Sequence, residues 1–180
     1  MTRIDLPRPA LMNKDDREQY DRFPANLTRA LLRTRGCTAG YLDLGYALIN
    51  TSLNAKQREL VILRVAALSR SAYERMQHLP PAKKAGWTDA DIAAIERGQG
   101  GQLDPASAAL LYFVDECVKD VHVSDRTFIE LRQFLSEEAV ADATLLTGFY
   151  MMTARFLETL SVDLDEAPSD ILTEQLVVAS

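Results

Sequence analysis

The chain has 180 residues, of which 47% are hydrophobic, and its 20 basic and 26 acidic side chains give a net charge of −6. The length indicates one domain with at most a tail, the hydrophobic share excludes a disordered chain, and the acidic balance argues against a nucleic-acid backbone as partner. The longest stretches without charge, 44–55 and 143–154, have 12 residues each, too few for a membrane helix of about 20 residues.

The first residues carry Pro7 and Pro9 and show no periodic pattern, so we expect an extended arm over residues 1–14. They also lack the apolar core of a signal peptide. The two cysteines, Cys37 and Cys117, lie far apart in unrelated contexts, and we interpret both as small buried hydrophobic residues. These features are typical of a reduced, cytoplasmic protein without a disulfide or a cysteine zinc site.

Helix is favoured over strand because the chain has only 8 glycines and 7 prolines and is rich in Ala and Leu. We predict one all-α domain of about eight or nine helices at residues 15–164, followed by a tail at 165–180. Pro24 divides the first helical stretch. The remaining predicted helices lie at about 25–34, 39–49, 55–69 and 72–79, and after the capping residues Thr88, Asp104, Ser124 and Ser136.

The predicted helix at 55–69 is apolar on nearly every face from Leu60 to Leu68, which indicates a central buried helix. Asn54 is a suitable N-cap for it. The next helix begins with Ser71-Ala-Tyr-Glu74, which matches a capping box, and Pro80-Pro81 should disturb or end that helix.

These two adjacent helices should form a hairpin that carries three titratable side chains. Glu74 and His78 lie four residues apart on one helical face, and Glu59 lies near the start of an apolar helix, where a carboxylate needs a partner. An imidazole with a pKa near ~6.5 can act as acid or base at neutral pH.

The run from Arg58 to His78 resembles the core of the carboxymuconolactone decarboxylase and alkylhydroperoxidase D superfamily. Ala82–Ile92 and Gly148–Glu158 are also similar to family segments. The resemblance is strong over about 53–97 and weaker over about 20–165, and it implies the alkylhydroperoxidase D-like helical fold. Members that act as peroxidases use a glutamate, two cysteines and a histidine. The resemblance places the glutamate at Glu59 and the histidine at His78, whereas Ser71 and Glu74 stand where the two cysteines would be.

Without these thiols, the resemblance implies the decarboxylase branch, which works without a cofactor. We therefore expect acid/base chemistry, a decarboxylation or a related lyase or isomerase step, on a small carboxylated or lactone metabolite. The expected catalytic residues are Glu59, Glu74 and His78. The expected substrate-binding residues are Arg64 or Arg70 as a carboxylate clamp, together with Ser71 and Tyr73.

Several alternatives remain open. Ser71 and Glu74 form only a capping box, Glu74 and His78 only a surface pair, or Glu59 only pairs with an arginine such as Arg64. Glu59, Glu74 and His78 are also a possible three-ligand metal set, although no metal is our expectation. The alternative functions are a degenerate relative of the peroxidases and a non-catalytic oligomeric binding protein.

We expect a homo-oligomer, a dimer, trimer or hexamer, because the apolar segments near 60–68 and from Ile171 to Val178 can bury against another subunit. The N-terminal arm is a further candidate for such a contact.

Overall fold

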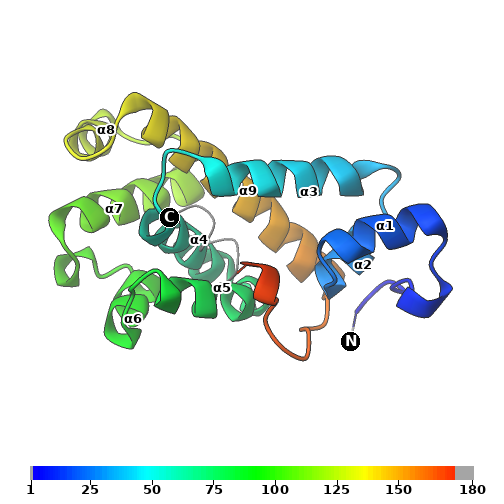
Figure 1. The fold of residues 1–180 in the computed structure, drawn as a ribbon. Helices are drawn as coiled ribbons and strands as arrows, with labels where there is room; N and C mark the ends of the chain where they lie inside the picture. The colour runs from blue at the N-terminus through cyan, green and yellow to red at the C-terminus, as the bar shows by residue number, and fades with distance from the viewer. Residues whose placement is uncertain (1, 173–180) are drawn as a thin grey trace.

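The computed structural model describes residues 2–172, and over these residues it is all-helical, as the sequence predicts. Figure 1 shows α6, α7 and α8 at one end of the molecule and α1 and α2 at the other. The α-helices are α1 (Lys14–Arg22), α2 (Asn26–Leu31), α3 (Cys37–Ala47), α4 (Ala55–Ser69), α5 (Ala72–Lys84), α6 (Asp89–Arg97), α7 (Pro105–Asp120), α8 (Asp125–Arg132) and α9 (Glu137–Leu160). Three short 3-10 helices are η1 (Pro9–Leu11), η2 (Leu48–Asn50) and η3 (Gly100–Gln102). None of the helices in the described part of the chain is long and apolar enough to cross a membrane.

Helix α4 lies at the centre and packs against α5, α6, α7 and α9 (Figure 1). Its residues Leu60, Val61, Leu63 and Val65 are fully buried, which confirms the predicted central helix. Burying one such side chain contributes about 1.5–3 kcal/mol, so α4 is a major source of the hydrophobic stabilisation.

The buried side chains form two clusters. The larger one gathers around α4, α7 and α9, and the smaller one joins α2 and the end of α9 to Tyr73 of α5. A cavity in the molecule is lined by residues of both clusters, for example by Leu27 of the smaller and Ile62 of the larger. The cavity therefore lies where the two cores meet.

Most predicted helix boundaries are confirmed by capping contacts. Asn54 and Gln57 form a capping box at the start of α4, and Thr88 and Asp91 form another at α6. The side chains of the predicted caps Asp104, Ser124 and Ser136 each accept a hydrogen bond from a backbone N–H in the first turn. Local side-chain-to-backbone bonding thus sets where these helices begin.

Two predicted helix ends are wrong. Pro80 and Pro81 do not end α5, which continues to Lys84. The residues around the prolines are held by packing, since Pro81 and Ala82 are buried and the Trp87 N–H donates to the Ala82 carbonyl (3.1 Å). Helix α2 ends at Leu31 rather than near residue 34, because the Thr34 N–H bonds the Leu31 carbonyl in a tighter turn (2.8 Å).

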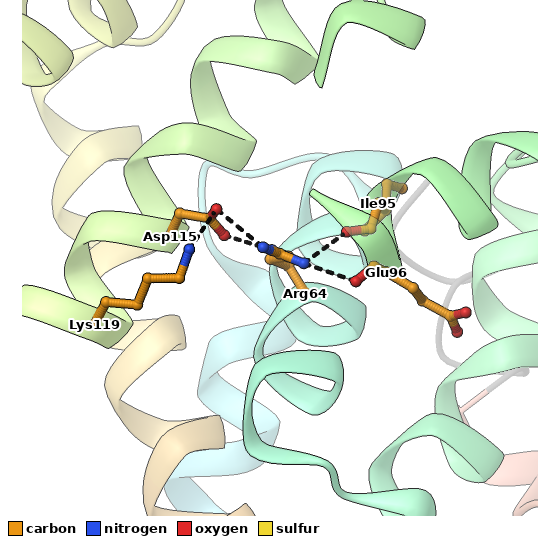
Figure 2. Close-up of polar contacts among 5 residues, drawn as sticks. All are labelled: Arg64, Ile95, Glu96, Asp115 and Lys119. Carbon is orange, nitrogen blue, oxygen red and sulfur yellow. Dashed lines mark hydrogen bonds and ion pairs between the residues drawn. The ribbon is translucent and has the colours of Figure 1, made fainter. Parts of the chain in front are cut away.

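A buried polar joint links α4 to α6 and α7 (Figure 2). The Arg64 guanidinium pairs with both carboxylate oxygens of Asp115, and its Nη1 donates to the carbonyls of Ile95 (3.3 Å) and Glu96 (2.7 Å). Lys119 adds a second cation to Asp115, with its Nζ 3.0 Å from Oδ2. The joint fixes the end of α6 against the central helix.

The corner between α4 and α6 also holds Trp87, whose side chain is 4% exposed. Its indole Nε1 donates to the Lys56 carbonyl (2.9 Å), and the Lys56 ammonium lies 4.2 Å from the ring centroid. The indole N–H and the cation–π contact together anchor the start of α4.

The expected N-terminal arm lies along its own chain. The Arg3 N–H donates to the Leu160 carbonyl (2.8 Å), and Arg29 of α2 donates to the Pro7 carbonyl (2.8 Å). Of the apolar segment 171–178, Ile171 and Leu172 pack on the smaller cluster, and the other residues lie outside the described part of the chain.

Residues 165–169 are bonded to the domain beside α5. Asp165 accepts from the Asn26 N–H (2.8 Å), from Gln77 Nε2 (2.9 Å) and from the Tyr73 hydroxyl. The Ser169 N–H donates to Gln77 Oε1 (2.7 Å). This stretch of the expected tail is thereby held next to the cavity.

Candidate functional site

A cavity of about 90 Å³ lies between α3, α4, α5 and α9. Its walls are mainly apolar and aromatic, and Leu172 is one of the lining residues. Four of the residues predicted from the sequence line it: Glu59, Tyr73, Glu74 and His78. A small, mainly apolar space with a few convergent polar groups is typical of a ligand site.

Glu59 and His78 form a buried pair across the α4–α5 hairpin. The imidazole Nδ1 lies 3.0 Å from Glu59 Oε2, and each residue is 4% exposed. The ring also meets Tyr150 edge-on, with 5.1 Å between centroids. With Nδ1 bound to the carboxylate, Nε2 is the ring nitrogen that remains for a proton transfer.

The protonation of His78 is decided by opposing effects. Burial disfavours the charged imidazolium, but the negative charge and hydrogen bond of Glu59, with a smaller effect of Glu74, outweigh it and raise the pKa of His78. Glu59 therefore both orients the ring and stabilises its protonated form.

Glu74 lies on the other side of the ring. Its Oε2 is 3.7 Å from His78 Nε2, beyond hydrogen-bonding distance, and the residue is 3% exposed. Burial raises the pKa of Glu74 to about 7; His78 opposes this rise, while Glu158 and Glu59 add to it. Near neutral pH this carboxyl group is available both as acid and as base.

The predicted capping box at the start of α5 is wrong. Ser71 is the N-cap residue, but its side chain makes no capping bond, and its buried Oγ has no hydrogen-bond partner. Glu74 lines the cavity instead of reaching back to the helix end. The alternative of an exposed Glu74–His78 surface pair is also wrong, since both residues are buried.

The two predicted arginine clamps lie elsewhere. Arg64 is engaged by Asp115 and by the end of α6 (Figure 2), and it does not line the cavity. Arg70 is exposed at the left-handed C-cap of α4, with φ 55°. Glu59 pairs with His78 and not with Arg64, so that alternative is wrong as well. Ser71, predicted to bind substrate, is also absent from the cavity wall.

The guanidinium at the cavity belongs to Arg58, which the sequence reasoning missed. Arg58 is 5% exposed, lines the cavity, and donates from Nη1 to the Leu53 carbonyl (2.9 Å). Burial lowers its pKa, with Glu59 and Tyr150 opposing. One signal in the sequence could have found Arg58: it is a second charged residue in the turn that holds Glu59. It also lies four positions before the apolar Ile62, and so on the same helical face, and both residues line the cavity.

The aromatic wall was also missed. Tyr41 of α3 and Phe149 of α9 pack with 4.8 Å between their centroids, and the Tyr41 hydroxyl bonds Thr153. The Tyr73 ring lines the cavity, but its hydroxyl donates to Asp165 and accepts from the Leu27 N–H (3.1 Å). The hydrogen bonds of the Tyr73 hydroxyl therefore go to the segments that hold Asp165 and Leu27 beside the cavity.

The cysteines lie outside the cavity wall. Cys37 is exposed, which contradicts its predicted burial, and Cys117 is partly buried. Among residues 2–172, no group of three or more His, Cys, Asp or Glu side chains is arranged to hold a metal ion.

Comparison with known proteins agrees with this fold. Residues 36–116 match the model of the carboxymuconolactone decarboxylase family. A peroxidase-related protein with an alkylhydroperoxidase AhpD core, from Ralstonia eutropha JMP134, has 18% identity and a TM-score of 0.79, with 92% of this chain and 93% of that chain covered. A peroxidase-related protein from Silicibacter sp. TM1040 has 15% identity and a TM-score of 0.78, with 92% of each chain covered.

A third similar structure is a variant of the debrominase Bmp8 in complex with 2,3,4-tribromopyrrole. It has 13% identity and a TM-score of 0.72, with 98% of this chain and 100% of that chain covered. The search of curated proteins found no match. At these identities the likenesses establish the alkylhydroperoxidase D-like fold, and they leave the reaction to the chemistry of the site.

Proposed function

We propose, on the premise that residues 36–116 belong to the carboxymuconolactone decarboxylase family, that the cavity is the active site of an acid/base enzyme. Its reaction is a decarboxylation, or a related lyase or isomerase step, on a small carboxylated or lactone metabolite. The observation that carries the proposal is the buried Glu59–His78 pair with Glu74 beside the second ring nitrogen.

The residues have distinct roles in this proposal. Glu59 holds the imidazole by Nδ1 and stabilises its charge, so that Nε2 gives or takes the proton. Glu74 is a second proton carrier, supported by its pKa of about 7. In a decarboxylation the bond to the carboxyl carbon breaks, CO₂ leaves, and the electron pair stays on the substrate. The imidazolium then delivers its proton to the substrate carbon from which CO₂ has left.

The thiol route of the peroxidases is not part of the proposal. It needs a cysteine thiolate and a resolving thiol, and Ser71 and Glu74 supply neither. Cys37 and Cys117 lie on α3 and α7, away from the cavity wall. Hydroperoxide reduction that disappears in the double variant Cys37→Ser, Cys117→Ser would establish the thiol route instead.

The test is turnover of lactone acids and 3-oxo acids, with carboxymuconolactone included because of the family name. CO₂ release and hydrogen–deuterium exchange next to the carbonyl are followed by NMR. We expect His78→Ala to lower kcat/KM about 10²–10⁴-fold and Glu59→Gln to lower it less. Arg70→Gln, an exposed change on the same helix pair, should leave it unchanged. Full turnover by His78→Ala contradicts the proposal.

A further inference from the structure

Arg58, which lines the cavity, has one side-chain nitrogen without a partner among the described residues. The Arg58 side chain uses Nη1 for the Leu53 carbonyl, whereas its Nη2 is buried and makes no hydrogen bond. An unsatisfied buried donor costs about 1–3 kcal/mol, and more when the group is charged. A ligand that accepts a hydrogen bond from this guanidinium therefore offsets the free-energy cost of burying an unpaired donor.

The neighbouring carboxylates do not satisfy this donor. Glu59 acts on Arg58 electrostatically, but its Oε2 is hydrogen-bonded to His78 Nδ1. Glu74 lies at the other ring nitrogen. Arg64 shows the contrast, because its guanidinium is bonded to Asp115 and to two carbonyl oxygens. Arg58 is thus a guanidinium of the cavity lining with one nitrogen that makes no hydrogen bond within the described residues.

The rest of the wall fits the apolar part of a small acid. Tyr41, Phe149 and Tyr150 present aromatic surface, and Ile62 and Leu146 add aliphatic surface. A space of about 90 Å³ is large enough to hold several water molecules or a small organic acid. A planar carboxylate of a few carbon atoms suits both the size and this mixture of one cation and apolar walls.

We propose that Arg58 is the anion-binding residue of this site and that its guanidinium binds the carboxylate of a small planar acid, whose apolar part lies against the aromatic wall. This inference deepens the proposed function, on which it rests for the identity of the site. Arg58 and His78 together then explain recognition and proton transfer: the first holds the charged end, and the second reaches the carbon to be protonated.

The test uses crotonate and its neutral isostere crotonamide as probes, titrated by NMR or calorimetry into the full chain at pH 6.5. We expect crotonate to bind the wild type more tightly than crotonamide does. Arg58→Gln should weaken crotonate at least tenfold and leave crotonamide unchanged, and Arg58→Lys should recover part of the affinity. Arg70→Gln, which changes the exposed arginine at the C-cap of α4, is the matched control and should bind both probes as the wild type does.

Three results overturn the inference: equal binding of the two probes, no binding of crotonate, or unchanged crotonate affinity in Arg58→Gln. Arg58→Lys provides the comparison if Arg58→Gln fails to fold. The inference is separable from the reaction, since His78→Ala should still distinguish crotonate from crotonamide. If that variant binds crotonate and also keeps full turnover, the anion site stands and the acid/base proposal fails.

Discussion

Glu59 and Glu74 flank the same imidazole but meet it in different ways. Glu59 is hydrogen-bonded to Nδ1, whereas Glu74 is 3.7 Å from Nε2 and is buried. Burial raises the pKa of Glu74 to about 7, so this carboxyl group can exchange a proton near neutral pH. The distinction predicts a measurable effect on stability.

We predict that the Glu74→Gln variant becomes more stable relative to the wild type as the pH rises from 5 to 8. The pKa of Glu74 is about 7 in the folded protein against 4.5 ordinarily, so the folded state holds this proton more tightly. In the wild type, the stabilisation of the folded state by the protonated Glu74 carboxyl group is complete below pH 4.5. It is lost as the pH rises through 7, by an amount on the order of 3 kcal/mol. The raised pKa of His78 likewise lowers the stability of the wild type as the pH rises.

Urea unfolding at several pH values measures this difference. Glu18→Gln, an exposed change on α1, is the control and should keep the pH dependence of the wild type. A Glu74→Gln variant with an unaltered pH dependence would show that Glu74 does not titrate in this range.

At the residue scale, sequence could predict only part of the site. Glu59, Glu74 and His78 were predictable because one helical hairpin brings them together, and hairpins are local in sequence. Arg64 was assigned wrongly because its partner Asp115 is 51 residues away, on a helix whose packing no local pattern shows. Arg58 was missed because a charge near a helix start is ordinary, and only the folded structure shows its unpaired nitrogen.

At the scale of elements, two neighbouring helices begin differently. The start of α4 is closed by the Asn54–Gln57 capping box, whereas Ser71 at α5 makes no capping bond. Helix starts with local capping partners were predictable in sequence. The sequence also predicted the residue at which α5 begins, but its capping box does not form, because Glu74 lines the cavity beside His78, which is a tertiary effect.

We predict that Asn54→Ala lowers the free energy of unfolding by about 1 kcal/mol, whereas Ser71→Ala changes it much less. The first change removes a capping bond and the second removes only an unpaired hydroxyl. Chemical denaturation of both variants at one pH measures the two effects side by side. If Ser71→Ala proved as damaging as Asn54→Ala, Ser71 would have a partner in solution.

At the scale of the whole molecule, the hydrophobic core and the Arg64 joint both centre on α4. We predict that Asp115→Ala destabilises the fold by about 3 kcal/mol, because it leaves the Arg64 guanidinium buried without its carboxylate. Asp120→Ala, an exposed change at the end of the same helix, should have little effect. Equal unfolding free energies for the two variants, measured in urea, would mean that the joint contributes nothing.

The buried Trp87 has a practical consequence for all of these measurements. It is the single tryptophan of the chain, and it is fixed between the start of α4 and the beginning of α6. Its fluorescence therefore reports on one defined corner of the molecule, next to the helix that carries Arg58 and Glu59. Emission should shift to the red when this corner opens to water, so the protein carries an intrinsic optical probe of its own unfolding.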